Sequence, residues 1–145
     1  MSTRSYPLTP NDSLVITIGS FTARFPSGCV DRDVTVKVGE VGRLTSNPPD
    51  ATLTGDVWRL ELQDSDVRLT KDVTIQLPFT GPDDPELRVL RNTLIPQYPD
   101  PYPWTPDDSR YTQGRSWQPK RKASTRVANA RAGTTRELGS FSVGK

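Results

Sequence analysis

The fold class follows from the stretch Val34-Thr35-Val36-Lys37-Val38, in which β-branched valines alternate with polar residues. In an extended strand this alternation places the three valines on one face and the polar side chains on the other. The same pattern recurs in Trp58-Arg59-Leu60-Glu61-Leu62 and in Val73-Thr74-Ile75-Gln76-Leu77, which Pro78 ends because proline cannot donate to a sheet ladder. These three stretches predict strands with one face on a core, as in antiparallel sheets.

Other apolar runs between turn signals predict the remaining strands. We expect them at Leu14–Ile18, Phe21–Phe25, Leu87–Ile95, Ser116–Pro119, Thr125–Arg131 and Leu138–Val143. The breaker Asn47-Pro48-Pro49-Asp50 predicts a long surface connection over Gly39–Asp56, with a short edge strand near Leu53. No stretch has the apolar period of an α-helix. The sequence therefore predicts an all-β fold, an immunoglobulin-like antiparallel β-sandwich.

The length of 145 residues fits a single domain. Hydrophobic residues make up 32% of the chain, which also has 14 prolines and 10 glycines, so we expect a small core with long polar connections. We divide the chain into an N-terminal extension at residues 1–13 and a sandwich domain at residues 14–145. Within that domain, the closely spaced prolines of residues 96–114 predict a long arm, because they fit neither a helix nor a central strand.

The composition offers little catalytic chemistry. The chain has no histidine and one cysteine, Cys29, which removes the side chains that most often transfer protons near neutral pH or bind zinc. Acidic pairs such as Asp64 with Asp66, or Asp83 with Asp84, lack the glycine and distal glutamate of a calcium loop and predict solvated turns. We therefore expect no enzymatic activity, no cofactor and no metal.

Several absences guide our expectations about location and partners. A lone cysteine cannot close a disulfide within the chain. Residues 1–11 lack the apolar stretch of a secretory signal, and no segment is long and apolar enough to span a membrane. The formal net charge of +2 is too weak to drive binding to phosphate backbones. We expect no membrane contact, no nucleic-acid partner, and a place in the cytoplasm or in a virion-like assembly.

Three stretches carry a resemblance to a known family. They are Phe25–Cys29 with the Val34–Val36 that follows, Val57–Leu60 with the later Leu69–Pro78, and Leu138–Val143. Together they resemble ZU-five, the β-sandwich domain shared by ankyrins and netrin receptors. The first is similar to that family's proline-x-glycine turn, and the second to its K-P-V-T-I-x-L-P strand, with Asp72 where proline is usual. The resemblance implies a ZU-five-like sandwich that acts as an interaction module.

The dipeptide Phe141-Ser142 matches the site at which some members of this broad group cut themselves. That chemistry needs a base to help the serine hydroxyl attack its own preceding carbonyl, and relatives use a histidine that this chain lacks. Self-cleavage is therefore the least favoured function. The favoured interpretation is that Phe141 lies in the core while Ser140 and Ser142 face solvent, because successive strand residues alternate between faces.

The proline-rich arm contains the first group of candidate contact residues. A polyproline conformation would present aromatic rings at low entropic cost, and such rings are good interface anchors. The alternative is that the rings fold back over an open face of a small core, and both interpretations stay open. The residues concerned are Tyr98, Tyr102 and Trp104.

A second group of candidate contact residues is basic. Lys120, Arg121 and Lys122 form the densest run of positive charge, and Trp117 lies close by as a ring that could stack on a nucleic-acid base. A charged surface turn between two strands is the favoured interpretation, because the run is short and acidic residues precede it.

These observations favour a non-enzymatic protein-interaction or structural module that uses an exposed strand edge and the arm as contacts. The main alternative is a subunit of a repeating assembly, such as a phage or virus-like capsid, a decoration protein or a filament. In both cases the partner is a protein, including further copies of this chain as a homo-oligomer.

Overall fold

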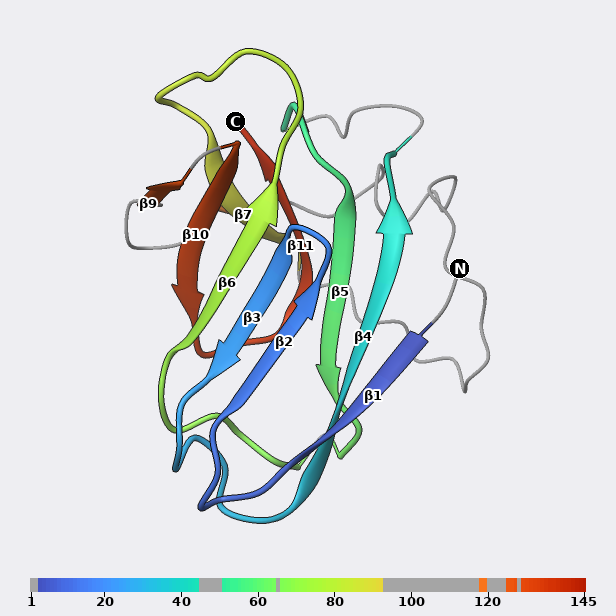
Figure 1. Ribbon diagram of the computed structural model, residues 1–145, viewed down its shortest axis with the longest axis vertical. Coiled ribbons are helices and arrows are strands. Elements are labelled where there is room, and N and C mark those ends of the chain that lie inside the picture. Colours follow the sequence, from blue (N-terminus) through green and yellow to red (C-terminus); the bar gives the residue numbers. More distant parts are fainter. Residues whose placement is uncertain (1–2, 45–50, 65, 93–117, 120–124, 128) are drawn as a thin grey trace.

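A computed structural model describes residues 3–44, 51–64, 66–92, 118–119, 125–127 and 129–145. These residues form two antiparallel β-sheets and contain no helix. The sheets pack face to face in a sandwich arrangement, with the main apolar core between them (Figure 1). The described part of the chain accordingly has no helix that could cross a membrane.

The larger sheet has six strands in the order β1-β4-β5-β11-β7-β8. Both β11 and β5 are central strands, while β1 and β8 are the edges. The bounds of its strands are β1 (Thr3–Leu8), β4 (Val34–Gly42), β5 (Val57–Leu62), β7 (Arg88–Asn92), β8 (Gln118–Pro119) and β11 (Gly139–Gly144).

The smaller sheet has five strands in the order β2-β3-β6-β10-β9, with β2 and β9 as its edges. Its first two strands form a hairpin, which agrees with the two runs that the sequence predicted there. The bounds are β2 (Leu14–Ile18), β3 (Phe21–Phe25), β6 (Val73–Pro78), β9 (Thr125–Val127) and β10 (Ala130–Thr135).

The main core is built by the alternating strands that the sequence identified. In β4, Val34, Val36 and Val38 are buried, and β6 repeats the alternation with its three apolar residues. Across the sandwich, the ring of Phe21 on β3 stacks on that of Trp58 on β5. The core is therefore assembled from one face of each sheet, as period-two alternation requires.

A second, smaller apolar cluster lies outside the sandwich. Val57 and Leu90 alternate with the core residues Trp58 and Val89, so they lie on the outer face of the six-stranded sheet. The long connection before β5 covers that face, and a backbone bridge joins Leu53 to β11. The members of this outer cluster are Val41, Leu44, Ala51, Leu53, Val57 and Leu90.

Two expectations about strand boundaries were wrong. Residues 3–8, assigned to an N-terminal extension, form edge strand β1, in which Tyr6 pairs with Val36. The expected single strand Thr125–Arg131 is instead a hairpin of β9 and β10, which turns beside Asn129 at a φ of 55°. Asparagine is one of the few residues that adopts this left-handed conformation readily. The proposed arm at residues 96–114 lies outside the described residues.

Candidate functional site

None of the contact residues predicted from the sequence falls in the described part of the chain. This applies to the aromatic residues of the arm and to the basic run alike, so both groups stay predictions. The residues are Tyr98, Tyr102, Trp104, Trp117, Lys120, Arg121 and Lys122.

The dipeptide Phe141-Ser142 lies in the middle of β11, between β5 and β7. The expectation that Ser140 and Ser142 face solvent was wrong, because both are fully buried. Ser142 pairs with Leu90 of the outer cluster. The Ser142 hydroxyl donates to the carbonyl oxygen of Gly55 at 3.0 Å. This hydrogen bond holds the hydroxyl against the covering connection, which is a structural role for the serine.

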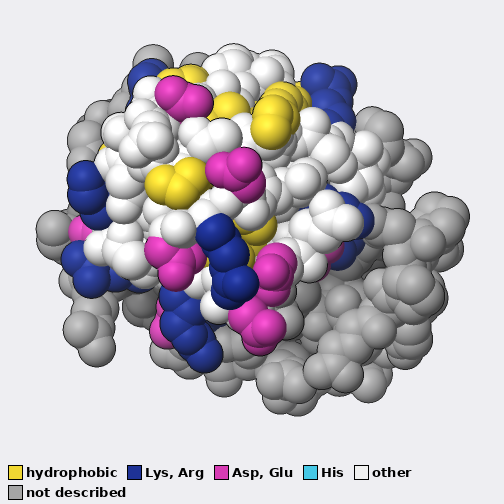
Figure 2. Space-filling view, turned by 90° about the horizontal axis from the view of Figure 1, so that it is seen from below, with side chains coloured by type: hydrophobic (Ala, Val, Ile, Leu, Met, Phe, Trp, Pro, Cys, Tyr) yellow, Lys and Arg dark blue, Asp and Glu magenta, His cyan; other side chains and the backbone are white. Residues whose placement is uncertain are grey.

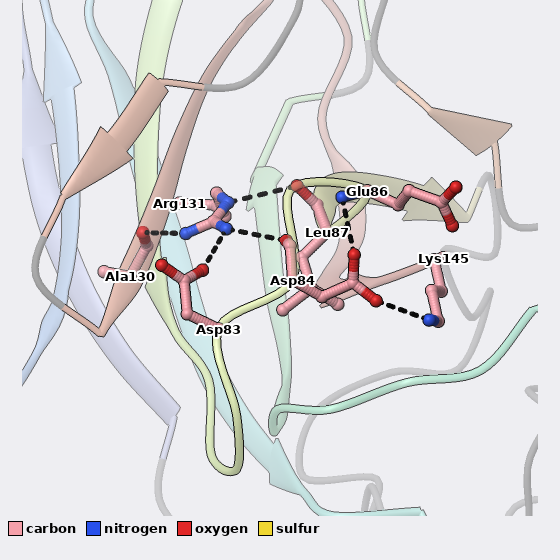
Figure 3. A network of polar contacts seen from close by, with 7 residues as sticks. All are labelled: Asp83, Asp84, Glu86, Leu87, Ala130, Arg131 and Lys145. Atoms are coloured by element: carbon pink, nitrogen blue, oxygen red, sulfur yellow. Dashed lines mark hydrogen bonds and ion pairs between the residues drawn. The ribbon is translucent and has the colours of Figure 1, made fainter.

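A buried arginine organises the β6–β7 loop (Figure 3). Arg131 on β10 has a side chain only 3% exposed. Its guanidinium donates to the carbonyl oxygens of Leu87 at 3.1 Å, Asp84 at 2.9 Å and Ala130 at 3.2 Å. It also donates to the carboxylate of Asp83 at 2.5 Å. All three guanidinium nitrogens thus have acceptors, which is what a buried charge requires.

Asp84 extends this network to the end of β11. Its carboxylate accepts from the ammonium of Lys145 at 2.5 Å and from the backbone N–H of Glu86 at 2.9 Å. The hydrogen bond from Lys145 is the main reason why the pKa of Asp84 lies below its ordinary value. The expectation that Asp83 and Asp84 form a solvated turn was therefore incomplete, since both carboxylates bind cationic side chains.

The acid-rich loops do not assemble a metal site in the part of the chain that the structure describes. Figure 2 shows the end of the sandwich seen from below, where basic and acidic side chains are interspersed over the coloured surface. Ion pairs on the surface of the described residues include Arg32–Asp31, at 3.9 Å, and Arg136–Asp72, at 3.2 Å.

The edge of β2 is the strongest candidate for a contact surface. One side of β2 pairs with β3, and no described strand pairs with its other side. The strand reads Leu-Val-Ile-Thr-Ile from Leu14 to Ile18, with neither charge nor proline. Val15 is 53% exposed and is the one large hydrophobic residue exposed among the described residues.

The hairpin geometry determines which backbone groups of β2 face outward. Gly19 and Ser20 form a two-residue loop, and a φ of 58° at Gly19 suits the first central position of a hairpin turn. The flanking pair Ile18 and Phe21 is then a hydrogen-bonded pair, and such pairs alternate along an antiparallel ladder. It follows that Val15 and Thr17 direct their backbone N–H and C=O groups toward the open edge.

The other sheet edges carry protective features. Strand β1 contains Arg4 and Pro7, and charged residues and prolines are common means of blocking edge pairing. The remaining edges, β8 and β9, are only two and three residues long. Among the edges that the structure describes, β2 is thus the one with both length and an unprotected sequence.

Comparison with known proteins adds no family assignment. The sequence matches no model of a known protein family, and no curated protein matches it significantly. The resemblance to ZU-five therefore stays a prediction. Sequence reasoning had identified Leu14–Ile18 as a strand but not its position at an edge, which depends on pairings between distant segments.

Proposed function

We propose that the chain is a non-enzymatic protein-interaction module whose contact surface is the open edge of β2. The observation that carries this proposal is an uncharged five-residue edge strand in which Val15 is exposed. Unpaired backbone groups on such an edge are a template for strand addition, in which main-chain hydrogen bonds supply affinity.

The polar side chains described above support a structural rather than a catalytic role. The hydroxyl of Ser142 is bound to Gly55, and the guanidinium of Arg131 is saturated by loop acceptors. We also propose that the sandwich is of immunoglobulin-like or ZU-five-like type. Two of the stretches that resemble ZU-five support that assignment. Leu138–Val143 overlaps β11, and Phe25–Cys29 lies on the path from β3 to β4.

Proline at Thr17 tests the proposed contact surface. The Thr17→Pro variant removes one outward N–H without removing a bond to β3, because proline is tolerated where the N–H faces solvent. The control Thr17→Ala changes the same side chain and keeps the N–H. Binders selected against the wild-type protein from displayed peptide and domain libraries should bind Thr17→Ala normally and fail to bind Thr17→Pro. Both variants should melt like the wild type, and binders indifferent to Thr17→Pro would overturn the proposal.

A further inference from the structure

Among the strands that the structure describes, the two sheets differ by one, and this difference leaves a position beside β2 that no described strand fills. Cross-sheet contacts place β10 over β7 and β6 over β11, and the Phe21–Trp58 stack places β3 over β5. Continuing this alignment places β2 over β4. In the described structure, β1 then has no strand of the smaller sheet above it (Figure 1).

The exposure of β1 agrees with this alignment. Leu8 and Tyr6 pair with Val34 and Val36, whose side chains face the core, so the inner face of β1 carries Leu8, Tyr6 and Arg4. Leu8 is buried, Tyr6 is half-buried and Arg4 is exposed. The inner face of β1 therefore loses its cover progressively toward Arg4.

Deepening the proposed function, on which this step rests, we infer that the occupant of the open position is a single extended segment of a partner protein. The segment adds to the edge of β2 and lies over the inner face of β1. Its backbone pairs with the outward groups of Val15 and Thr17. Its alternate side chains are apolar, because they meet Tyr6 and the half-buried Leu14 and Ile18.

The geometry favours a single partner segment over a second copy of the chain as the occupant. When two β2 strands pair antiparallel about a two-fold axis, both inner faces lie on the same side of the joined sheet. Strand β4 of the second copy would then need the space that β1 of the first copy already fills. A lone strand requires no such space, since neighbouring strands in a sheet are about 4.8 Å apart.

The inference predicts the sequence pattern of a ligand. Peptides selected from a displayed library of short unconstrained sequences should alternate apolar with polar residues. They should lack proline at the positions opposite Val15 and Thr17. On binding, the amide protons of Val15 and Thr17 should become protected from hydrogen exchange, because they gain acceptors in the added strand.

The Tyr6→Ser variant tests the position over β1, with Ser5→Ala on the opposite face of the same strand as its control. We expect the selected peptides to bind Tyr6→Ser roughly tenfold more weakly than wild type and Ser5→Ala equally well. The Tyr6→Phe variant, which keeps the ring, should also bind normally. Thermal melts of all three variants would show that the fold is retained.

The outcomes distinguish this inference from the proposed function. Peptides that depend on Thr17 but bind Tyr6→Ser as tightly as wild type would overturn the inference and leave the contact edge in place. Sedimentation velocity showing a dimer abolished by Thr17→Pro would do the same, because the occupant would be a second copy. A monomeric chain that selects no peptide dependent on Thr17 would overturn both.

Discussion

The ring of Phe21 lies nearly parallel to the indole of Trp58, with centroids 4.4 Å apart and planes at 10°. Phe21 belongs to β3 and Trp58 to β5, so this stack joins the two sheets directly. Aromatic pairs of this kind contribute beyond the area they bury. The pair is therefore a point at which loss of a side chain should destabilise the sandwich strongly.

Replacing Trp58 with alanine should destabilise the fold by about 3–5 kcal/mol, since it removes the stack and leaves a cavity. Trp58→Phe is the matched control. It keeps a ring and removes an indole N–H that is buried without an acceptor in the described structure, so it should retain most of the stability. Urea unfolding followed by circular dichroism measures both. Equal unfolding midpoints for Trp58→Ala and wild type would contradict the assigned cross-sheet packing.

Arg131→Met should cost about 3–5 kcal/mol, because Asp83 and the carbonyl oxygens of Leu87 and Asp84 lose their shared donor in a mostly buried site. The control Arg136→Met removes the exposed pair with Asp72 and should cost no more than about 1 kcal/mol. Urea midpoints give the comparison. If both variants unfolded at the same urea concentration as the wild type, the network around Arg131 would have no stabilising role.

The ionisation of Glu40 should make the stability of the fold depend on pH. Desolvation of the carboxyl group, followed by the nearby charge and hydrogen bond of Asp56, raises the pKa of Glu40, while Arg4 lowers it. A carboxyl group with a raised folded-state pKa opposes folding above that pKa, and this cost disappears as the pH falls through the pKa to below the ordinary value for glutamate. The ionisation of Asp84 has the opposite effect on stability. Because the folded state lowers the pKa of Asp84, its ionised carboxylate stabilises the fold, and this stabilisation is lost in acid.

Glu40→Gln should therefore melt at a higher temperature than wild type at pH 7, and the difference should vanish below about pH 4. Asp84 is present in both proteins, so its contribution cancels in the comparison. Differential scanning calorimetry across this range makes the measurement. A difference that stayed constant with pH would mean that the ionisation of Glu40 is not its cause.

The thiol of Cys29 should be unreactive in the folded protein. The residue is buried, and this burial is the main cause of its raised pKa, so little thiolate forms near neutral pH. A thiol reagent such as a maleimide should label the protein slowly under native conditions and stoichiometrically in denaturant. Rapid native labelling, measured by mass spectrometry, would contradict the burial of this side chain.

Local sequence patterns predicted the strands whose apolar residues alternate within one segment. The strand β1 was missed because Thr3–Leu8 is largely polar, and its pairing with β4 depends on a segment about 30 residues away. The burial of Ser142 was also missed, because it contacts the connection before β5, which is distant in the sequence. Alternation identifies two faces of a strand but does not show what packs on each.

The candidate site was predictable only in part, for a related reason. Leu14–Ile18 was recognisable as a strand, but its edge position follows from the order in which distant strands pair. The link from Arg131 to Asp83 likewise joins residues 48 positions apart in the chain. Such contacts are a property of the topology, which a single sequence does not display.

The placement of β1 and β11 makes the molecule mechanically unequal at its two ends. Of the described strands, β1 pairs with β4 alone, whereas β11 lies between β5 and β7. Lys145, which follows β11, also exchanges two backbone hydrogen bonds with Thr52. Under tension applied along the chain, the force on β11 would be shared by its hydrogen-bond ladders with β5 and β7. The force on β1 would fall on its single ladder with β4. The sandwich should therefore yield first by detachment of β1, while the strands around β11 remain assembled.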